Sequence, residues 1–329
     1  MKVTIYDVAR EAGLSIATVS RVINGKGGVT PKSEQKIRAA IERLGYIPDA
    51  SAQGLASSLV NTIGVAIAGV QISGRYCVQF LSGAECAARE RGFDLLLTST
   101  FGTPEEFVRT VRTRHKMDGL IFPSVSEYEE ALYAADFPVV YAGHRQPWDE
   151  KRLHVYGGFS GYRKEALELL ASKGCRKILF LEGNLVKIAD KNHRIIKDFM
   201  TASGFSPDQI EYVDGNDQPD RDFWRKIEER LSSDDPPDGL FIADDQYCPQ
   251  VYTLAAKYAR SIPEDLKVVS VIQDPADGVL LRPALTSFLV HSYQMGYNAA
   301  VKLIQLIQGE PVDDMLTYVP YSLIERESV

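Results

Sequence analysis

The first sixty residues contain two short helical patterns joined by a sharp turn, and no other feature constrains the fold as strongly. Apolar residues recur at helical spacing after Thr4, and Asp7 stands three residues beyond it, as in a capping box. Gly13 can adopt the positive φ that ends a first helix, and Ser15 is a favourable N-cap for a second. The spacing therefore predicts a helix-turn-helix unit.

The second predicted helix has one docked face and one open face. Val19, Val22 and Ile23 would hold it against the rest of the unit. The side chains left outside are short and uncharged except for one arginine, and they are Ile16, Ala17, Ser20 and Arg21. Such a surface suits insertion into the major groove of DNA. A small helical hairpin without a DNA role has similar spacing, so the neighbouring segments matter.

A third helix and a tether come next. Thr30 caps this helix, and Pro31 occupies its first position. Its apolar face consists of Ile37, Ala40, Ile41 and Leu44. Residues 45–48 end the helix, and residues 49–56 predict another short helical turn before a linker. Three helices, a stop and a tether favour a DNA-binding head over a catalytic unit.

From residue 61 the pattern changes to alternating strands and helices. Strands are predicted at 62–68, 93–98, 119–122, 138–141, 177–181, 210–213, 239–243 and 267–271. Helices are predicted at 78–91, 104–115, 127–135, 161–173, 192–203, 221–231 and 247–259. This alternation predicts two α/β lobes, each with a doubly wound parallel sheet. Open α/β sheets bind ligands at the carboxyl ends of their strands, so we expect a ligand cleft between the lobes.

Charge is distributed unevenly along the chain. The whole chain carries −7, whereas residues 1–60 carry +3, which leaves −10 for the remainder. A basic head on an acidic body fits a protein whose head alone meets phosphates, and so weakly charged a head needs two copies to bind tightly. The amino terminus has no apolar signal core and no stretch is long enough to span a membrane, so a cytoplasmic location is expected.

Catalytic and cofactor motifs are missing from the sequence. It contains no nucleophile elbow, no phosphate-binding loop and no dinucleotide fingerprint. The four cysteines and five histidines show no spacing typical of a metal site. The wide separation of the cysteines favours reduced, mostly buried thiols. Asp244 and Asp245 are adjacent, and neighbours on a strand point to opposite faces, so no shared acid–base site is implied. We therefore expect neither an enzyme nor a cofactor.

These motifs together resemble the LacI/GalR family of bacterial transcription regulators, over nearly the full length of the chain. The resemblance rests on 5–9, 19–25 and 44–48 in the head, and on 118–121, 137–140, Arg194, 243–245, 262–265 and 283–286 in the body. It implies an all-α helix-turn-helix head on a two-lobed body similar to periplasmic binding proteins. It also implies a homodimer, bound to a pseudo-palindromic double-stranded DNA operator as a repressor.

The resemblance also implies domain limits. The DNA-binding domain would span 1–48, the hinge helix and linker 49–60, and the effector-binding and dimerisation body 61–329. Lobe 1 would comprise about 61–159 and 289–318, and lobe 2 about 160–288 and 319–329. A small-molecule effector of the sugar or sugar-derivative class would bind between the lobes and control operator affinity.

The same resemblance assigns roles in DNA binding. Ile16, Ala17 and Arg21 fall where the family reads base edges, and Arg21 alone can make a bidentate contact with guanine. Residues expected to hold phosphates or cap helices are Thr4, Ser15, Thr18, Ser20 and Asn24. Ser51 and Leu55 lie in the hinge, where Leu55 would wedge into the minor groove. Gly54 departs from the family pattern and would keep the free hinge unfolded.

The effector pocket departs most from the family. Family members usually carry Pro-Asp and Asp-Asn at two positions that hold Val70-Gln71 and Gly157-Gly158 here, and sugar-binding relatives place an Asp where this chain has Ile272-Gln273. Carboxylates that clamp sugar hydroxyls are therefore missing at three expected places. The expected effector-binding residues are Gln71, Ser73, Arg75, Arg145, Arg194, Asp244 and Gln273. Arg75, Arg145 and His144 would add positive charge, which suits a phosphorylated or carboxylated ligand.

Several alternatives remain open at this point. A solute-binding protein of the periplasmic type would have much the same body and no DNA role. Within the regulator class, the effector acts either as inducer or as co-repressor. A phosphocarrier protein as co-repressor is not favoured, because the helix at 293–308 carries only Lys302 as a basic residue.

Overall fold

The computed structural model describes residues 3–23, 27–46, 59–67, 75–100, 102–115, 117–123, 127–143, 152–182, 198, 202, 205–206, 209–214 and 221–329. The chain divides into two compact units, residues 1–62 with 111–118 and residues 63–110 with 119–329. In the described part, none of the helices combines the length and apolar character that crossing a bilayer requires.

The amino-terminal unit begins with three helices whose ends are set by local capping. They are α1 (Ile5–Ala12), α2 (Ile16–Ile23) and α3 (Pro31–Leu44). The backbone N–H and hydroxyl of Thr4 donate to the Asp7 carboxylate at 2.9 and 2.7 Å. Gly13 has φ 65° after α1, as its position predicts. The shared core consists of Val8, Ala9, Ala12, Val19, Ile37 and Ala40.

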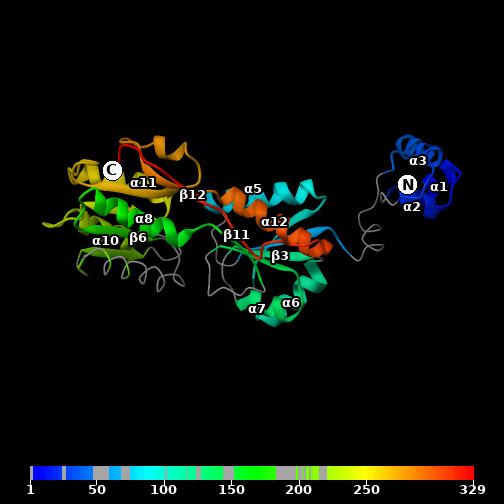
Figure 1. Cartoon of the computed structure of the whole chain (residues 1–329), viewed down its shortest axis with the longest axis horizontal. Coiled ribbons are helices and arrows are strands. Elements are labelled where there is room, and N and C mark those ends of the chain that lie inside the picture. The colour runs from blue at the N-terminus through cyan, green and yellow to red at the C-terminus, as the bar shows by residue number, and fades with distance from the viewer. Residues whose placement is uncertain are drawn as a thin grey trace. The chain divides into compact units, whose positions relative to one another are not determined.

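The second unit contains two six-stranded sheets (Figure 1). The first has the order β11-β5-β4-β3-β1-β2. Its strands are β1 (Thr62–Ala66), β2 (Asp94–Thr98), β3 (Gly119–Phe122), β4 (Val139–Ala142), β5 (Leu153–Tyr156) and β11 (Leu316–Tyr318). The pairings of β1 with β3, β3 with β4, β4 with β5 and β5 with β11 are parallel.

Helices cover both faces of the first sheet (Figure 1). α5 (Arg75–Glu90) and α12 (Ser292–Gln308) lie side by side on one face. α6 (Pro104–Thr110) and α7 (Glu127–Ala134) lie on the other, and α6 continues into a π-helical turn, η1 (Val111–His115). The first sheet and these helices form lobe 1.

The second sheet has the order β12-β10-β9-β8-β6-β7. Its strands are β6 (Ile178–Glu182), β7 (Ile210–Asp214), β8 (Gly239–Ile242), β9 (Lys267–Ile272), β10 (Thr286–Val290) and β12 (Tyr321–Ile324). β12 pairs antiparallel with β10, which modifies the expectation of a purely parallel sheet. The associated helices are α8 (Phe159–Ser172), α10 (Arg221–Leu231), α11 (Cys248–Lys257), and the 3-10 turns η2 (Asp245–Tyr247) and η3 (Asp277–Val279). The second sheet and these helices form lobe 2.

Strand alternation divides the residues of lobe 2 between two cores. Phe180 and Phe241 pack in the same cluster as Leu167 of α8. Their neighbours along β6 and β8, such as Leu179 and Leu240, pack with the apolar stripes of α10 and α11. A doubly wound sheet with both faces covered is the result, as the continuous apolar strands predict.

The chain passes between the two sheets three times. β5 of lobe 1 leads into α8 of lobe 2, β10 of lobe 2 leads into α12 of lobe 1, and β11 leads into β12. Each lobe is therefore built from segments that are distant in sequence.

Several elements differ from their expected limits. α5 begins at Arg75, three residues before the predicted start, because Cys77 already packs in the core. The predicted helix at 104–115 is α-helical only to Thr110. β5 is not among the predicted strands, since it has only four residues and His154 interrupts its apolar run, yet His154 is buried. The helix predicted at 192–203 lies almost entirely outside the described residues.

Candidate functional site

The open face of α2 carries the side chains that the sequence assigns to base reading. Ile16 is 42% exposed, and Ala17 and Arg21 are exposed as well. Val19, on the opposite side, is fully buried against α1 and α3. An exposed isoleucine, alanine and arginine on one face of a short helix fit a surface that meets DNA bases.

Hydrogen bonds fix the amino end of α2. Ser15 Oγ accepts from the backbone N–H of Thr18 at 3.2 Å, and the two hydroxyls are 2.8 Å apart. Ser15 is therefore the N-cap that the sequence predicts. The α2 N-terminus leaves further backbone N–H groups without helical partners, which suits a phosphate oxygen.

The remaining predicted DNA contacts fall into two groups. The Thr4 hydroxyl is engaged with Asp7, and Ser20 is half-buried. Asn24 of the head and Ser51 and Leu55 of the hinge lie outside the described residues, so their predicted roles stay predictions.

A second candidate surface lies at the carboxyl ends of the strands in the two lobes. Arg75 opens α5, on the chain after β1, while Asp244 and Asp245 follow β8. Gln273 and Asp277 follow β9. Gln71, Ser73, Arg145 and Arg194, together with His144, lie outside the described residues.

Asp244 and Gln273 are held by neighbours. The Asp244 carboxylate accepts from the Gln246 backbone N–H at 3.2 Å and from Gln246 Nε2 at 2.6 Å, so it caps η2. Gln273 Oε1 accepts from the hydroxyl of Ser292, the first residue of α12, at 2.7 Å. Gln273 thus links lobe 2 to the start of a lobe 1 helix.

Arg75 pairs with two carboxylates that the sequence reasoning does not assign to the site. Its Nη1 donates to Asp277 Oδ1, and its Nε lies 4.0 Å from Asp245 Oδ2. Arg75 is therefore already neutralised, which weakens its expected role in attracting an anionic ligand. The sequence analysis assigns Asp245 no role beyond its adjacency to Asp244, and Asp277 has no local signal besides its place after a buried strand.

Burial raises the pKa of Asp244 and of Asp245. For Asp244, burial is the main cause, and the hydrogen bonds from Gln246 act against it by lowering the pKa. The pKa of Asp245 rises to about 6, first through burial and then through the nearby charges of Asp244 and Asp277, while Arg75 lowers it. In the described part of the chain, no group of histidine, cysteine and acidic side chains is arranged to hold a metal ion.

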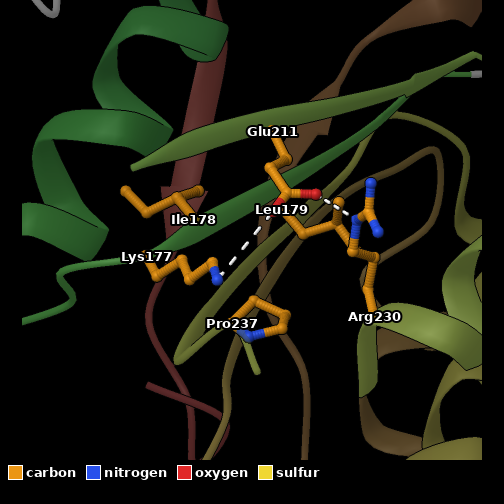
Figure 2. Close-up of a pocket in the computed structure, with 6 residues that line it drawn as sticks. All are labelled: Lys177, Ile178, Leu179, Glu211, Arg230 and Pro237. Atoms are coloured by element: carbon orange, nitrogen blue, oxygen red, sulfur yellow. Dashed lines mark hydrogen bonds and ion pairs between the residues drawn. The ribbon is translucent and has the colours of Figure 1, made fainter. Parts of the chain in front are cut away.

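Figure 2 shows a depression at the opposite edge of the second sheet. It is lined by Lys177, Ile178, Leu179, Glu211, Arg230 and Pro237. Lys177 precedes β6, so the depression lies at the amino ends of the strands, away from the edge at which α/β sheets bind ligands. Its charged groups are already paired, Glu211 with both Lys177 and Arg230.

Comparisons with known proteins match both the head and the body of the chain. Residues 4–49 match the family of bacterial regulatory proteins of the lacI type, and residues 167–329 match the periplasmic binding protein-like domain. Catabolite control protein A of Priestia megaterium is 30% identical over 335 residues, which cover 100% of this chain and 99% of the relative. The chain belongs to the LacI family. Catabolite control protein A of Staphylococcus xylosus is 31% identical, with 99% of each chain covered.

Solved structures show the same fold for this LacI-family protein. The lac repressor dimer bound to operator and the anti-inducer ONPF superposes with a TM-score of 0.83 at 24% identity, covering 100% of this chain and 99% of the repressor. CcpA of Lactococcus lactis has a TM-score of 0.66 at 18% identity, covering 82% of this chain and 98% of that one.

The family consists of transcriptional regulators. This LacI-family protein is accordingly a DNA-binding regulator with a helix-turn-helix head and an effector-binding type of body. The alternative of a solute-binding protein without a DNA role is not favoured, because the head matches the family as well as the body does.

Proposed function

We propose that this LacI-family protein is a cytoplasmic repressor that binds a pseudo-palindromic operator as a homodimer. A small-molecule effector of the sugar or sugar-derivative class, bound between the lobes, controls its affinity for the operator. The observation that carries the proposal is the open face of α2, where Ile16, Ala17 and Arg21 are exposed on a helix held by a well-packed core. The body serves as a binding module without catalysis.

The proposed division of labour follows the family. The DNA-binding domain is residues 1–48, the hinge 49–60 and the body 61–329. In the head, Ser15 and Thr18 fix the end of α2 near a phosphate, as their capping contacts support. Ser51 and Leu55 are assigned to the minor groove.

The effector site is placed at the carboxyl ends of the strands. Asp244 and Gln273 lie there on lobe 2 and Arg75 on lobe 1. Gln71, Ser73, Arg145 and Arg194 are assigned to the same site through the family pattern alone. The relative solved with cellobiose, the transcriptional regulator CelR, supports a sugar as the chemical class.

Dimerisation has a candidate surface on lobe 2. Leu280 is 74% exposed and the adjacent Val279 is 48% exposed, at the end of η3. Arg326 holds this loop from behind, donating to the carbonyl oxygens of Pro275 and Leu285 at 2.8 Å. Two large apolar side chains on a well-anchored loop suit a protein interface.

Binding of an Arg21→Ala variant to operator DNA tests the proposal. The operator is first found by footprinting the purified protein on DNA upstream of neighbouring genes. Loss of a bidentate contact with guanine in each half-site should weaken binding at least tenfold, at about 1–3 kcal/mol per contact. The matched control is Arg38→Ala, which removes the same charge from α3, where Arg38 pairs with Glu34 at 2.7 Å.

Two results would count against the proposal. The first is a wild-type protein that protects no dyad-symmetric stretch of DNA. The second is an equal loss of affinity in both variants, because Arg21 would then contribute charge and no base recognition.

A further inference from the structure

Arg75 makes a contact between the two lobes that involves no ligand. Arg75 is the first residue of α5 in lobe 1, whereas Asp245 and Asp277 follow β8 and β9 of lobe 2. The partners Arg75 and Asp277 are 202 residues apart in sequence. Separation of the carboxyl edges of the two sheets would break this contact.

The two carboxylates are much more buried than the guanidinium that neutralises them. The side chains of Asp277 and Asp245 are only 12% and 14% exposed, and that of Arg75 is 58% exposed. Carboxylates withdrawn from water require a counter-charge. Among the described residues, Arg75 is the only basic side chain within ion-pair distance of either one.

The ion pair between Arg75 and Asp277 is of a weak type, because it involves only one oxygen of the carboxylate. Arg75 reaches Asp277 through one oxygen, and the other, Oδ2, is buried without a hydrogen-bond partner among the described residues. The pair is therefore not the bidentate fork that makes arginine–carboxylate contacts strongest. An exposed guanidinium on a single oxygen favours one arrangement of the lobes without fixing it.

We propose that Arg75 acts as a latch that holds the carboxyl edges of the two lobes together when no effector is bound. The latch sets the basal position of the lobe equilibrium, which an effector then shifts by its differential affinity. This regulatory consequence rests on the proposed function, whereas the latch itself is a property of the body alone.

Distances between spin labels on the two lobes test the latch. Labels are placed at Glu105→Cys on α6 and Gln250→Cys on α11, two exposed positions. Cys86, the native cysteine that is only partly buried, is replaced by serine so that it does not react with the label. The other native cysteines, Cys77, Cys175 and Cys248, are buried and are retained. Dilution into unlabelled protein leaves labels in one subunit of each assembly. Loss of a partly exposed ion pair in Arg75→Gln or Asp277→Asn should increase the open-to-closed ratio about fivefold.

Two further variants make the result specific. Arg89→Gln removes a charge from the same helix. Arg89 pairs with Glu85 within α5, with Nε 3.1 Å from Glu85 Oε1, so this variant should leave the distances between the lobes unchanged. Arg75→Asp combined with Asp277→Arg restores a pair of opposite charges and should return the ratio toward the wild-type value. Circular dichroism confirms that each variant is folded.

Each outcome has one meaning. An unchanged distribution in folded Arg75→Gln, or an equal shift in Arg89→Gln, overturns the latch. Failure of the exchanged pair to move the ratio back also overturns it, because the effect would not depend on the pairing. Operator titration of the labelled protein separates the two proposals, since a protein that binds no DNA refutes the proposed function and leaves the distances valid.

Discussion

At the scale of single residues, two glycines allow α5 and α12 to pack backbone to backbone. A Cβ atom on Gly83 would lie 1.9 Å from the carbonyl oxygen of Tyr293, and one on Gly296 would lie 1.9 Å from that of Phe80. Neither position tolerates a side chain, because backbone atoms cannot rotate aside as side chains do. The close contact of these helices therefore depends on two missing methyl groups.

The variant Gly83→Ala should destabilise the body. The methyl group would force α5 and α12 apart, and overpacking of this kind costs about 1–3 kcal/mol. Urea denaturation measures the change in the free energy of unfolding, with Ser82→Ala, the neighbouring position on the helix, as the control. A variant as stable as the wild type would show that the helices can separate without cost.

Residue-scale signals also explain which parts of the head are predictable. Thr4, Asp7, Gly13 and Ser15 act on backbone groups at most four positions away, so the helices of the head could be placed without a structure. Asp277 carries no such local signal, because its partner is 202 residues distant. Pairing across the lobes depends on tertiary structure that no local pattern encodes.

At the scale of elements, the turn after β8 contains a carboxyl group whose charged form is disfavoured by burial and by neighbouring carboxylates. Asp245 lies at the start of η2 with a pKa raised from 3.8 to about 6 by burial and by its acidic neighbours. Since the folded state binds this proton more tightly than the unfolded state does, stability falls as the pH rises from about 4 to about 6. Above that range the loss is complete and constant.

Replacement of Asp245 by asparagine should remove this part of the pH dependence. The stability of Asp245→Asn relative to the wild type should rise between pH 4 and pH 6 and then level off, with a total gain of up to about 3 kcal/mol. Thermal melting of both proteins across this range measures the difference. A difference that is constant with pH would show that Asp245 titrates normally.

Element limits are predicted unevenly for a physical reason. α10 begins and ends where its apolar periodicity does, since one face packs and the other is solvated. β10, β11 and β12 are missing from the predicted strands, and the two edge strands among them, β11 and β12, contain no buried residue. Short edge strands are stabilised by pairing with a neighbour, and a sequence pattern does not record that pairing.

At the scale of the whole molecule, assembly should depend on the loop after η3. Leu280→Ser removes the most exposed large apolar side chain of the described residues and should weaken dimerisation about tenfold. Sedimentation velocity over a range of concentrations measures the dissociation constant. The control is Leu306→Ser on α12, where the side chain is 40% exposed. Equal dimer strength in Leu280→Ser and the wild type would place the interface elsewhere.

The threefold passage of the chain between the sheets limits how this protein can be taken apart. The stretch 167–329 matches a single domain family, but it contains α12 without the strands of lobe 1 on which α12 packs, and β11 without β5, with which β11 pairs. Expressed alone, that stretch would display the apolar underside of a helix with nothing to pack on. Cleavage of the backbone at any one of the three connections would leave the two lobes joined by the other two connections. Neither half can be released by a single cut, and neither can be produced as one uninterrupted fragment.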